Sequence, residues 1–147
     1  MDLPIPPVET EPTPADVRFL ESQLYDDNVE KTGINDGQWL SIFVRDDTGT
    51  IVAGIHGWTW GGMGKVQTLW VRPDLRRHGY GTRLLAAAEQ EARARGCDRL
   101  MLETFSFQAP LFYQKHGYEV VGVLDDILPP HREYRLRKNL GATAPSP

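Results

Sequence analysis

Cysteine is almost absent from this 147-residue chain, in which Cys97 is the only one. A single cysteine can form no internal disulfide, so a disulfide framework is excluded, and it cannot build a cysteine-based metal cage. The unpaired thiol is compatible with a reducing compartment. We therefore expect a cytoplasmic protein that holds no metal.

Long apolar runs and an excess of basic residues are also missing. No stretch approaches the roughly 20 apolar residues of a membrane span, and the proline-rich, acidic start of the chain does not resemble a signal peptide. Sixteen Lys and Arg against 20 Asp and Glu leave a formal net charge of −4, whereas a general nucleic-acid binder needs a broad basic surface. We expect neither a membrane nor a nucleic acid as partner.

What remains is the composition of an ordinary globular domain, with 40% hydrophobic and 24% charged residues. The length favours one domain. We predict a flexible proline-rich arm over residues 1–13, a single domain over residues 14–140 and a disordered tail over residues 141–147. Whether the arm forms a short edge strand at residues 6–10 stays open.

Hydrophobic periodicity alternates between helix and strand along the predicted domain. Thr13 and Pro14 suit the N-cap and first position of a helix over about residues 14–31, and residues 81–96 and 109–117 carry further helical patterns. Strand-like segments lie on both sides of a turn at 46–49 within residues 38–60, then at about 65–72, 97–107, 118–124 and 133–140. One strand–helix–strand unit implies a parallel crossover, so the fold class is α/β (α+β) with a mixed, mostly antiparallel sheet.

An anion site is indicated where the third strand runs into the second long helix. Between Arg76 and Thr82 the sequence "RRHGYGT" supplies consecutive backbone N–H groups, two glycines, a hydroxyl and two arginines. A helix N-terminus holds phosphate groups well, and glycine lets the backbone approach them closely. Neither the Walker spacing nor a βαβ dinucleotide fingerprint is present. Arg72 is either another phosphate ligand or an outward-facing strand residue.

Two segments resemble the GNAT superfamily of acetyl-CoA-dependent N-acetyltransferases. The stretch "VRPDLRRHGYGTRLL" is similar to its pyrophosphate loop [Q/R]-x-x-G-x-[G/A], with Arg76, Gly79 and Gly81 at the three defined positions. A second motif is matched by Ala109, Phe112, Tyr113, Lys115, Gly117, Tyr118 and Glu119. The resemblance covers about residues 35–138 and implies a central sheet of six to seven strands, flanked by helices and splayed at the acetyl-CoA site.

The resemblance also implies where acetyl-CoA binds. Backbone groups of the third strand are expected to pair with the pantetheine arm, and the loop after it is expected to hold the pyrophosphate. An amide and an aromatic side chain near the short helix complete the expected cofactor contacts. The residues concerned are Leu69, Trp70, Val71, Arg76, Arg77, His78, Gly79, Tyr80, Gly81, Thr82, Gln108 and Phe112; Gln108 stands where many relatives carry asparagine.

For the chemistry, the family position of Tyr113 implies a general acid that protonates the departing CoA thiolate; packing against the cofactor is the alternative role. Glu103, on the strand bordering the expected gap, is the candidate base. His56 and His131 are rivals because imidazole titrates near neutral pH, and a water-mediated base or none at all also stays open.

The acceptor pocket is less defined. Trp58 and Trp60 are two residues apart in a strand, so they face the same side, and Trp39 is expected near them. Three roles are open for these tryptophans: binding a cationic or apolar acceptor, stabilising the hairpin, or forming a dimer interface. Acidic side chains that suit a cationic acceptor are Asp26, Asp27, Asp125 and Asp126.

The sequence therefore predicts an acyltransferase that moves the acetyl group of acetyl-CoA to a primary amine, of a small molecule or of a peptide or protein, by direct attack in a ternary complex. The alternative is a CoA-binding regulatory or interaction module of the same fold without turnover. A homodimer is left open, and the identity of the acceptor is not given by the residues.

Overall fold

The computed structural model describes residues 1–141 and divides the chain into two compact units, residues 1–35 and the part that begins at Asp36. The first unit consists of an extended segment and helix α1 (Pro14–Thr32). The Thr13 hydroxyl accepts a hydrogen bond from the Asp16 N–H, and Gly33 ends the helix in the left-handed region at φ 71°. Residues 1–12 form no strand, so the edge strand left open at residues 6–10 is not formed. Within the described part of the chain, no helix is long and apolar enough to cross a bilayer.

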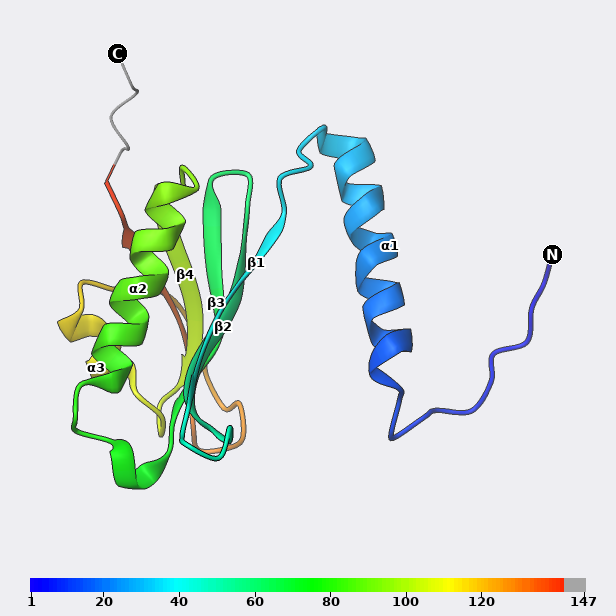
Figure 1. The fold of residues 1–147 in the computed structure, drawn as a ribbon. Coiled ribbons are helices and arrows are strands. Elements are labelled where there is room, and N and C mark those ends of the chain that lie inside the picture. The colour runs from blue at the N-terminus through cyan, green and yellow to red at the C-terminus, as the bar shows by residue number, and fades with distance from the viewer. Residues whose placement is uncertain (142–147) are drawn as a thin grey trace, which may run out of the picture. The chain divides into compact units, whose positions relative to one another are not determined.

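The second unit is built on one six-stranded sheet (Figure 1). Its strands are β1 (Gln38–Arg45), β2 (Ile51–Trp60), β3 (Met63–Val71), β4 (Arg99–Phe105), β5 (Glu119–Leu124) and β6 (Glu133–Asn139). A short 3₁₀ turn, η1 (Pro73–Leu75), and two helices, α2 (Tyr80–Ala94) and α3 (Pro110–Lys115), connect them. The spatial order is β1-β2-β3-β4-β6-β5. Only β3 and β4 run parallel; every other neighbouring pair is antiparallel.

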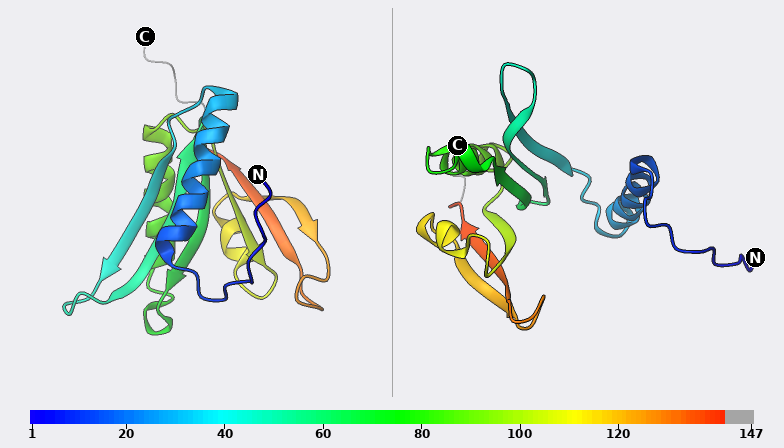
Figure 2. Two further views of the ribbon diagram at one scale, coloured as in Figure 1. Left: turned by 90° about the vertical axis from the view of Figure 1, so that its right-hand side faces the viewer. Right: turned by 90° about the horizontal axis from the view of Figure 1, so that it is seen from below.

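Helices α2 and α3 lie on the same face of the sheet, called here the inner face (Figures 1 and 2). The predicted stripe of α2, Leu84, Leu85, Ala88 and Ala92, is buried there. Alternate residues of the strands meet it, among them Ile55, Leu100, Leu102 and Leu136. The mixed six-stranded sheet confirms the predicted class, and the predicted helices and strands are found within a few residues of their expected bounds. The position of β6 between β4 and β5 was not predicted.

One charged residue lies within this apolar layer. Glu89 on α2 is only 5% exposed. Its carboxylate accepts a hydrogen bond from Lys138 Nζ on β6 at 2.6 Å and one from the Tyr118 hydroxyl at 3.4 Å. Because a buried charge is costly without a partner, this cluster ties α2 to β6 and to the segment before β5.

The Tyr118 hydroxyl makes stability depend on pH in the alkaline range. Burial, followed by the nearby Glu89 carboxylate, raises the pKa of Tyr118 far above its usual value near 10. Above pH 10 the unfolded chain loses this proton while the folded chain keeps it, so stability present below pH 10 is lost as the pH rises further. We expect the free energy of unfolding, measured by urea titration, to fall above pH 10 less steeply in Tyr118→Phe. Every other ionisable group is the same in both proteins, so equal slopes would contradict the assignment to Tyr118.

Candidate active site

The parallel pair β3–β4 is joined over only half of its length. Met63 to Val66 pair with Arg99 to Leu102, and beyond that point the two strands diverge (Figure 2). From Thr68 to Val71, β3 is paired with β2 alone. Its other edge therefore presents backbone N–H and C=O groups that have no strand to bind. The predicted splay is thus present between β3 and β4.

A β-bulge marks the start of this gap. Gly57 pairs with Val66 and His56 with Thr68, so Gln67 is an extra residue on β3. A Cβ on Gly57 would overlap the carbonyl oxygen of Lys65, which explains why glycine stands opposite the bulge. Bulges re-aim a strand, and the extra residue of this one comes immediately after Val66, the last residue of β3 that pairs with β4.

The loop between β3 and α2 gives the first turn of α2 the backbone features that favour an anion. Arg77 and Gly79 adopt positive φ angles of 63° and 82°, and Gly79 caps the helix. The N–H groups of the first turn point out of the helix without intrahelical partners, and the helix dipole favours a negative charge there. A Cβ on Gly81 would lie 3.4 Å from Phe112 Cζ, so the first turn of α2 adjoins α3.

The arginines around this loop have different partners. The Nε–H of Arg76 donates to the Val71 carbonyl oxygen at 2.9 Å, which fixes the loop to the end of β3. Arg72 forms an exposed two-point ion pair with Asp74, with Nε to Oδ1 at 2.6 Å, and its Nη1 lies 3.8 Å from Asp46 Oδ2. The hydrogen bond from Arg72 lowers the pKa of Asp74. Of the two roles left open for Arg72, these contacts favour the surface role.

Tyr113 lies at the centre of the short helix α3 and is 8% exposed. Its ring packs edge-on against Phe112 and Tyr118, at centroid distances of 5.3 and 5.8 Å. Burial raises the pKa of the Tyr113 phenol, so the hydroxyl keeps its proton through the neutral range. Leu69 of β3 packs against the same core cluster. Tyr113 is thus a protonated phenol whose ring is held in place among buried side chains.

Gln108 is engaged by the chain itself. Its side-chain oxygen accepts hydrogen bonds from the Phe105 N–H at 2.8 Å and from the Thr104 hydroxyl at 3.3 Å. The amide therefore closes the end of β4, and only its NH₂ group is left for a cofactor.

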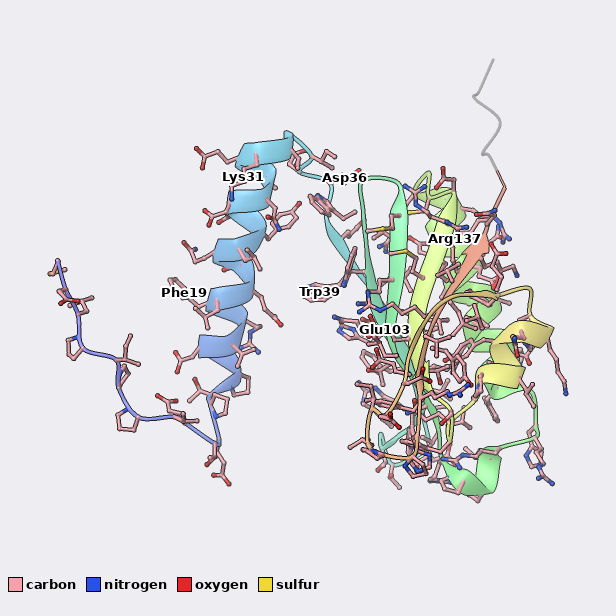
Figure 3. All side chains as sticks on the ribbon, turned by 180° about the vertical axis from the view of Figure 1, so that it is seen from behind. Phe19, Lys31, Asp36, Trp39, Glu103 and Arg137 are labelled. Carbon is pink, nitrogen blue, oxygen red and sulfur yellow. The ribbon has the colours of Figure 1, made fainter. Side chains whose placement is uncertain are left out.

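Glu103 points away from α2, because its neighbours Leu102 and Thr104 are the buried ones. The face it shares with Trp39, opposite α2 and α3, is called here the outer face (Figure 3). The Glu103 carboxylate lies between two cations, 3.4 Å from Lys65 Nζ and 3.7 Å from Arg135 Nη2. These two neighbours were not anticipated from the sequence, because only the register of β3, β4 and β6 brings them together.

The histidines differ in how they are held. His56, on the outer face of β2, lies with Nδ1 2.6 Å from the Ser41 hydroxyl and stacks on Trp39 at a centroid distance of 5.1 Å. His131 meets Phe107 edge-on, His116 Nδ1 lies 2.7 Å from the Phe112 carbonyl oxygen, and His78 Nδ1 lies 2.8 Å from the Arg76 carbonyl oxygen. No group of three or more potential metal ligands occurs among residues 1–141.

Comparison with known proteins matches this geometry to a family. Residues 7–118 match the model of the Acetyltransferase (GNAT) family. A blasticidin-S acetyltransferase of Streptomyces morookaense is 38% identical over 119 residues, which cover 76% of this chain and 85% of that protein. The crystal structure of an acetyltransferase from Agrobacterium tumefaciens superposes with a TM-score of 0.80 and 28% identity, over 95% of this chain and 99% of that one. A streptothricin acetyltransferase from Bacillus anthracis, solved with acetyl coenzyme A, shares the fold at a TM-score of 0.60 and 22% identity, over 69% and 62% of the two chains.

The match covers the anion loop, the splayed strands and the Tyr113 helix together. A long thioester with a diphosphate at one end is a ligand that can use both an unpaired strand edge and a helix N-terminus. The chain belongs to the GNAT family and is an acetyltransferase that uses acetyl-CoA.

Proposed function

We propose that the chain transfers the acetyl group of acetyl-CoA to a primary amine by direct attack in a ternary complex. The observation that carries this proposal is the gap between β3 and β4, which opens at the end of β3 where the chain leads on to the N-terminus of α2. The unpaired edge at Leu69, Trp70 and Val71 binds the pantetheine arm. Backbone N–H groups from Arg77 to Thr82 bind the diphosphate, and Arg76 and Arg77 add positive charge.

The remaining contacts to the cofactor come from α3 and the segment before it. Phe112 adjoins the first turn of α2, so its ring packs beside the cofactor. Gln108 offers its NH₂ group, because its oxygen already serves Phe105 and Thr104.

Three chain groups carry the chemistry in this proposal. An N–H of the open β3 edge donates to the thioester carbonyl oxygen as negative charge develops there. Tyr113 donates its phenolic proton to the leaving sulfur, which is supported by its burial and raised pKa. Glu103 accepts the proton from the attacking amine; it is the first residue of β4 beyond the paired segment.

Direct attack is favoured over an acetylated cysteine because of where Cys97 lies. The Cys97 side chain is 1% exposed and precedes the paired end of β4. Burial raises the pKa of its thiol, and the thiolate is the form that attacks a thioester.

Binding and turnover can be tested separately. We expect acetyl-CoA to raise the melting temperature of the full chain, because a ligand that binds only the folded state stabilises it. NAD and ATP serve as controls, since each carries a diphosphate but no pantetheine arm to pair with β3. Stabilisation by all three equally would contradict the role of β3. Release of free CoA thiol on addition of amines then distinguishes an enzyme from a CoA-binding module without turnover.

The acceptor class, the cellular compartment and the assembly belong to the same proposal. A relative named for blasticidin S supports a small-molecule amine over a protein. We place the enzyme in the cytoplasm because its one cysteine is a free, buried thiol. A homodimer is kept as an expectation, to be tested by sedimentation.

A further inference from the structure

A continuous row of side chains crosses the outer face at the mouth of the gap, and we propose that it binds an aromatic amino acid as acceptor. This inference rests on the proposed function and names the substrate class of that site. The row consists of Trp39, Trp58, Lys65, Glu103 and Arg135, and is called here the acceptor row.

The sheet register places these five side chains next to one another. Trp39 on β1 lies directly opposite Trp58 on β2, and Trp58 lies opposite Lys65 on β3. Lys65 reaches diagonally to Glu103 on β4, with 3.4 Å between Nζ and Oε1. Glu103 in turn pairs with Arg135 on β6. Each residue has at least one buried neighbour in its own strand, so all five project from the outer face.

The acceptor row crosses the sheet at the point where β3 and β4 begin to diverge. Val66 and Leu102 form the last pair between these strands. Lys65 comes immediately before that pair on β3, and Glu103 comes immediately after it on β4. Because α2 and α3 cover the inner face (Figures 1 and 2), we expect an amine to reach a thioester in the gap from the outer face, beside this row.

One end of the acceptor row alternates in charge. Lys65 and Arg135 flank the single carboxylate of Glu103, so this end holds one more positive charge than negative. The side chains of Arg135 and Glu103 are 59% and 36% exposed and are therefore accessible to a ligand. An amino acid carries the complementary pair of charges, with its ammonium suited to Glu103 and its carboxylate to Arg135 and Lys65.

The other end of the acceptor row is aromatic. Trp39 is 58% exposed although its indole is held in place by the stacked ring of His56, which Ser41 contacts in turn. A large aromatic surface that is both exposed and held in place suits a planar ring. Trp58 on β2 and Glu103 on β4 are separated by two inter-strand spacings, about 10 Å between their backbones. The indole and the carboxylate extend from these backbones, so the distance left between the two groups is shorter. A ring bound by the tryptophans therefore leaves its amine within reach of Glu103.

Three matched acceptors test the two ends of the row. Thiol release from acetyl-CoA is measured with tyrosine, with tyrosinamide, which lacks only the carboxylate charge, and with alanine, which lacks the ring. The rates are divided by the concentration of unprotonated amine, because converting the carboxylate to an amide changes the pKa of the neighbouring amino group. We expect kcat/KM for tyrosine to exceed that for either comparison compound by about tenfold, as one charge-assisted contact or one stacked ring gives.

Two variants with matched controls connect these preferences to the row. Arg135→Met is expected to abolish the preference for tyrosine over tyrosinamide, whereas Arg99→Met, at the paired end of β4 on the same face, leaves it unchanged. Trp39→Ala is expected to abolish the preference for tyrosine over alanine, whereas Phe43→Ala, an exposed aromatic on the same face of β1, leaves it unchanged.

The outcomes separate the acceptor class from the reaction. Equal rates with the three acceptors, or preferences that survive in Arg135→Met and Trp39→Ala, would overturn the acceptor row while leaving amine acetylation intact. A preference for tyrosinamide would also overturn it, and would indicate the amino terminus of a peptide. If acetyl-CoA binds but no amine of a broader panel causes release of free CoA thiol, both the proposed acetyl transfer and this inference are rejected.

Discussion

Replacement of Tyr113 by phenylalanine is expected to lower kcat by at least about 100-fold, within the range that loss of a general acid gives. The dissociation constant of acetyl-CoA should change little, because the buried ring and its edge-on contacts to Phe112 and Tyr118 remain. The measurement is single-turnover thiol release at saturating acetyl-CoA, together with binding measured by calorimetry. A loss in kcat without a loss in affinity would identify the hydroxyl as a group that acts on the reaction.

The matched control is Tyr118→Phe, which removes a buried hydroxyl from the neighbouring ring. Tyr118 donates to Glu89, so its loss should lower stability and leave kcat close to that of the parent protein. If Tyr113→Phe retains the full rate, the thiolate leaves without a proton from this residue and Tyr113 serves only to pack the site.

Replacement of Lys138 by methionine is expected to lower the free energy of unfolding by about 3–5 kcal/mol, the cost of leaving a buried charge without its partner. Glu89 is 5% exposed, and Lys138 Nζ, at 2.6 Å, is the only cation in salt-bridge contact with it among the described residues. Urea unfolding at pH 7 measures the change. Lys115→Met, which removes an exposed lysine on α3, should change stability by less than about 0.5 kcal/mol.

A second substitution distinguishes a lost ion pair from lost packing. Glu89→Gln combined with Lys138→Met removes both charges, and we expect it to restore a large part of the stability lost in the single variant. If the double variant is no more stable than Lys138→Met, the effect comes from the methylene groups of the lysine and not from the unpaired carboxylate.

Local sequence signals were sufficient for the elements and for the loop. The caps at Thr13 and Gly33 gave the limits of α1, and the apolar spacing of Leu84, Leu85, Ala88 and Ala92 gave the buried face of α2. The glycines of the loop predicted where the chain turns into the helix, and the structure has Gly79 at the cap with φ 82°. These features depend on residues within a few positions of one another, so the sequence alone carries them.

Features that depend on register could not be predicted in this way. Glu89 falls on the buried stripe of α2, but its partner Lys138 is 49 residues further along the chain. The bulge at Gln67 is visible only once β2 and β3 are paired. The two cations beside Glu103 come from β3 and β6, and the second of these meets β4 only because β6 lies inside the sheet and β5 at its edge. The alternation of side chains along β4 predicted that Glu103 and Leu102 face opposite sides of the sheet, but it did not predict which of these sides is buried.

The four residue pairs between β3 and β4 also have a mechanical consequence. They form a short seam between two smaller antiparallel sheets, β1-β2-β3 and β4-β6-β5. Each of these is hydrogen-bonded along most of its length. The two are joined to each other by the seam, by the Lys65–Glu103 ion pair and by the packing and polar contacts of the helices on the inner face. The weakest line through the sheet therefore runs along the proposed acetyl-CoA site, and local opening of the sheet is expected along this line first.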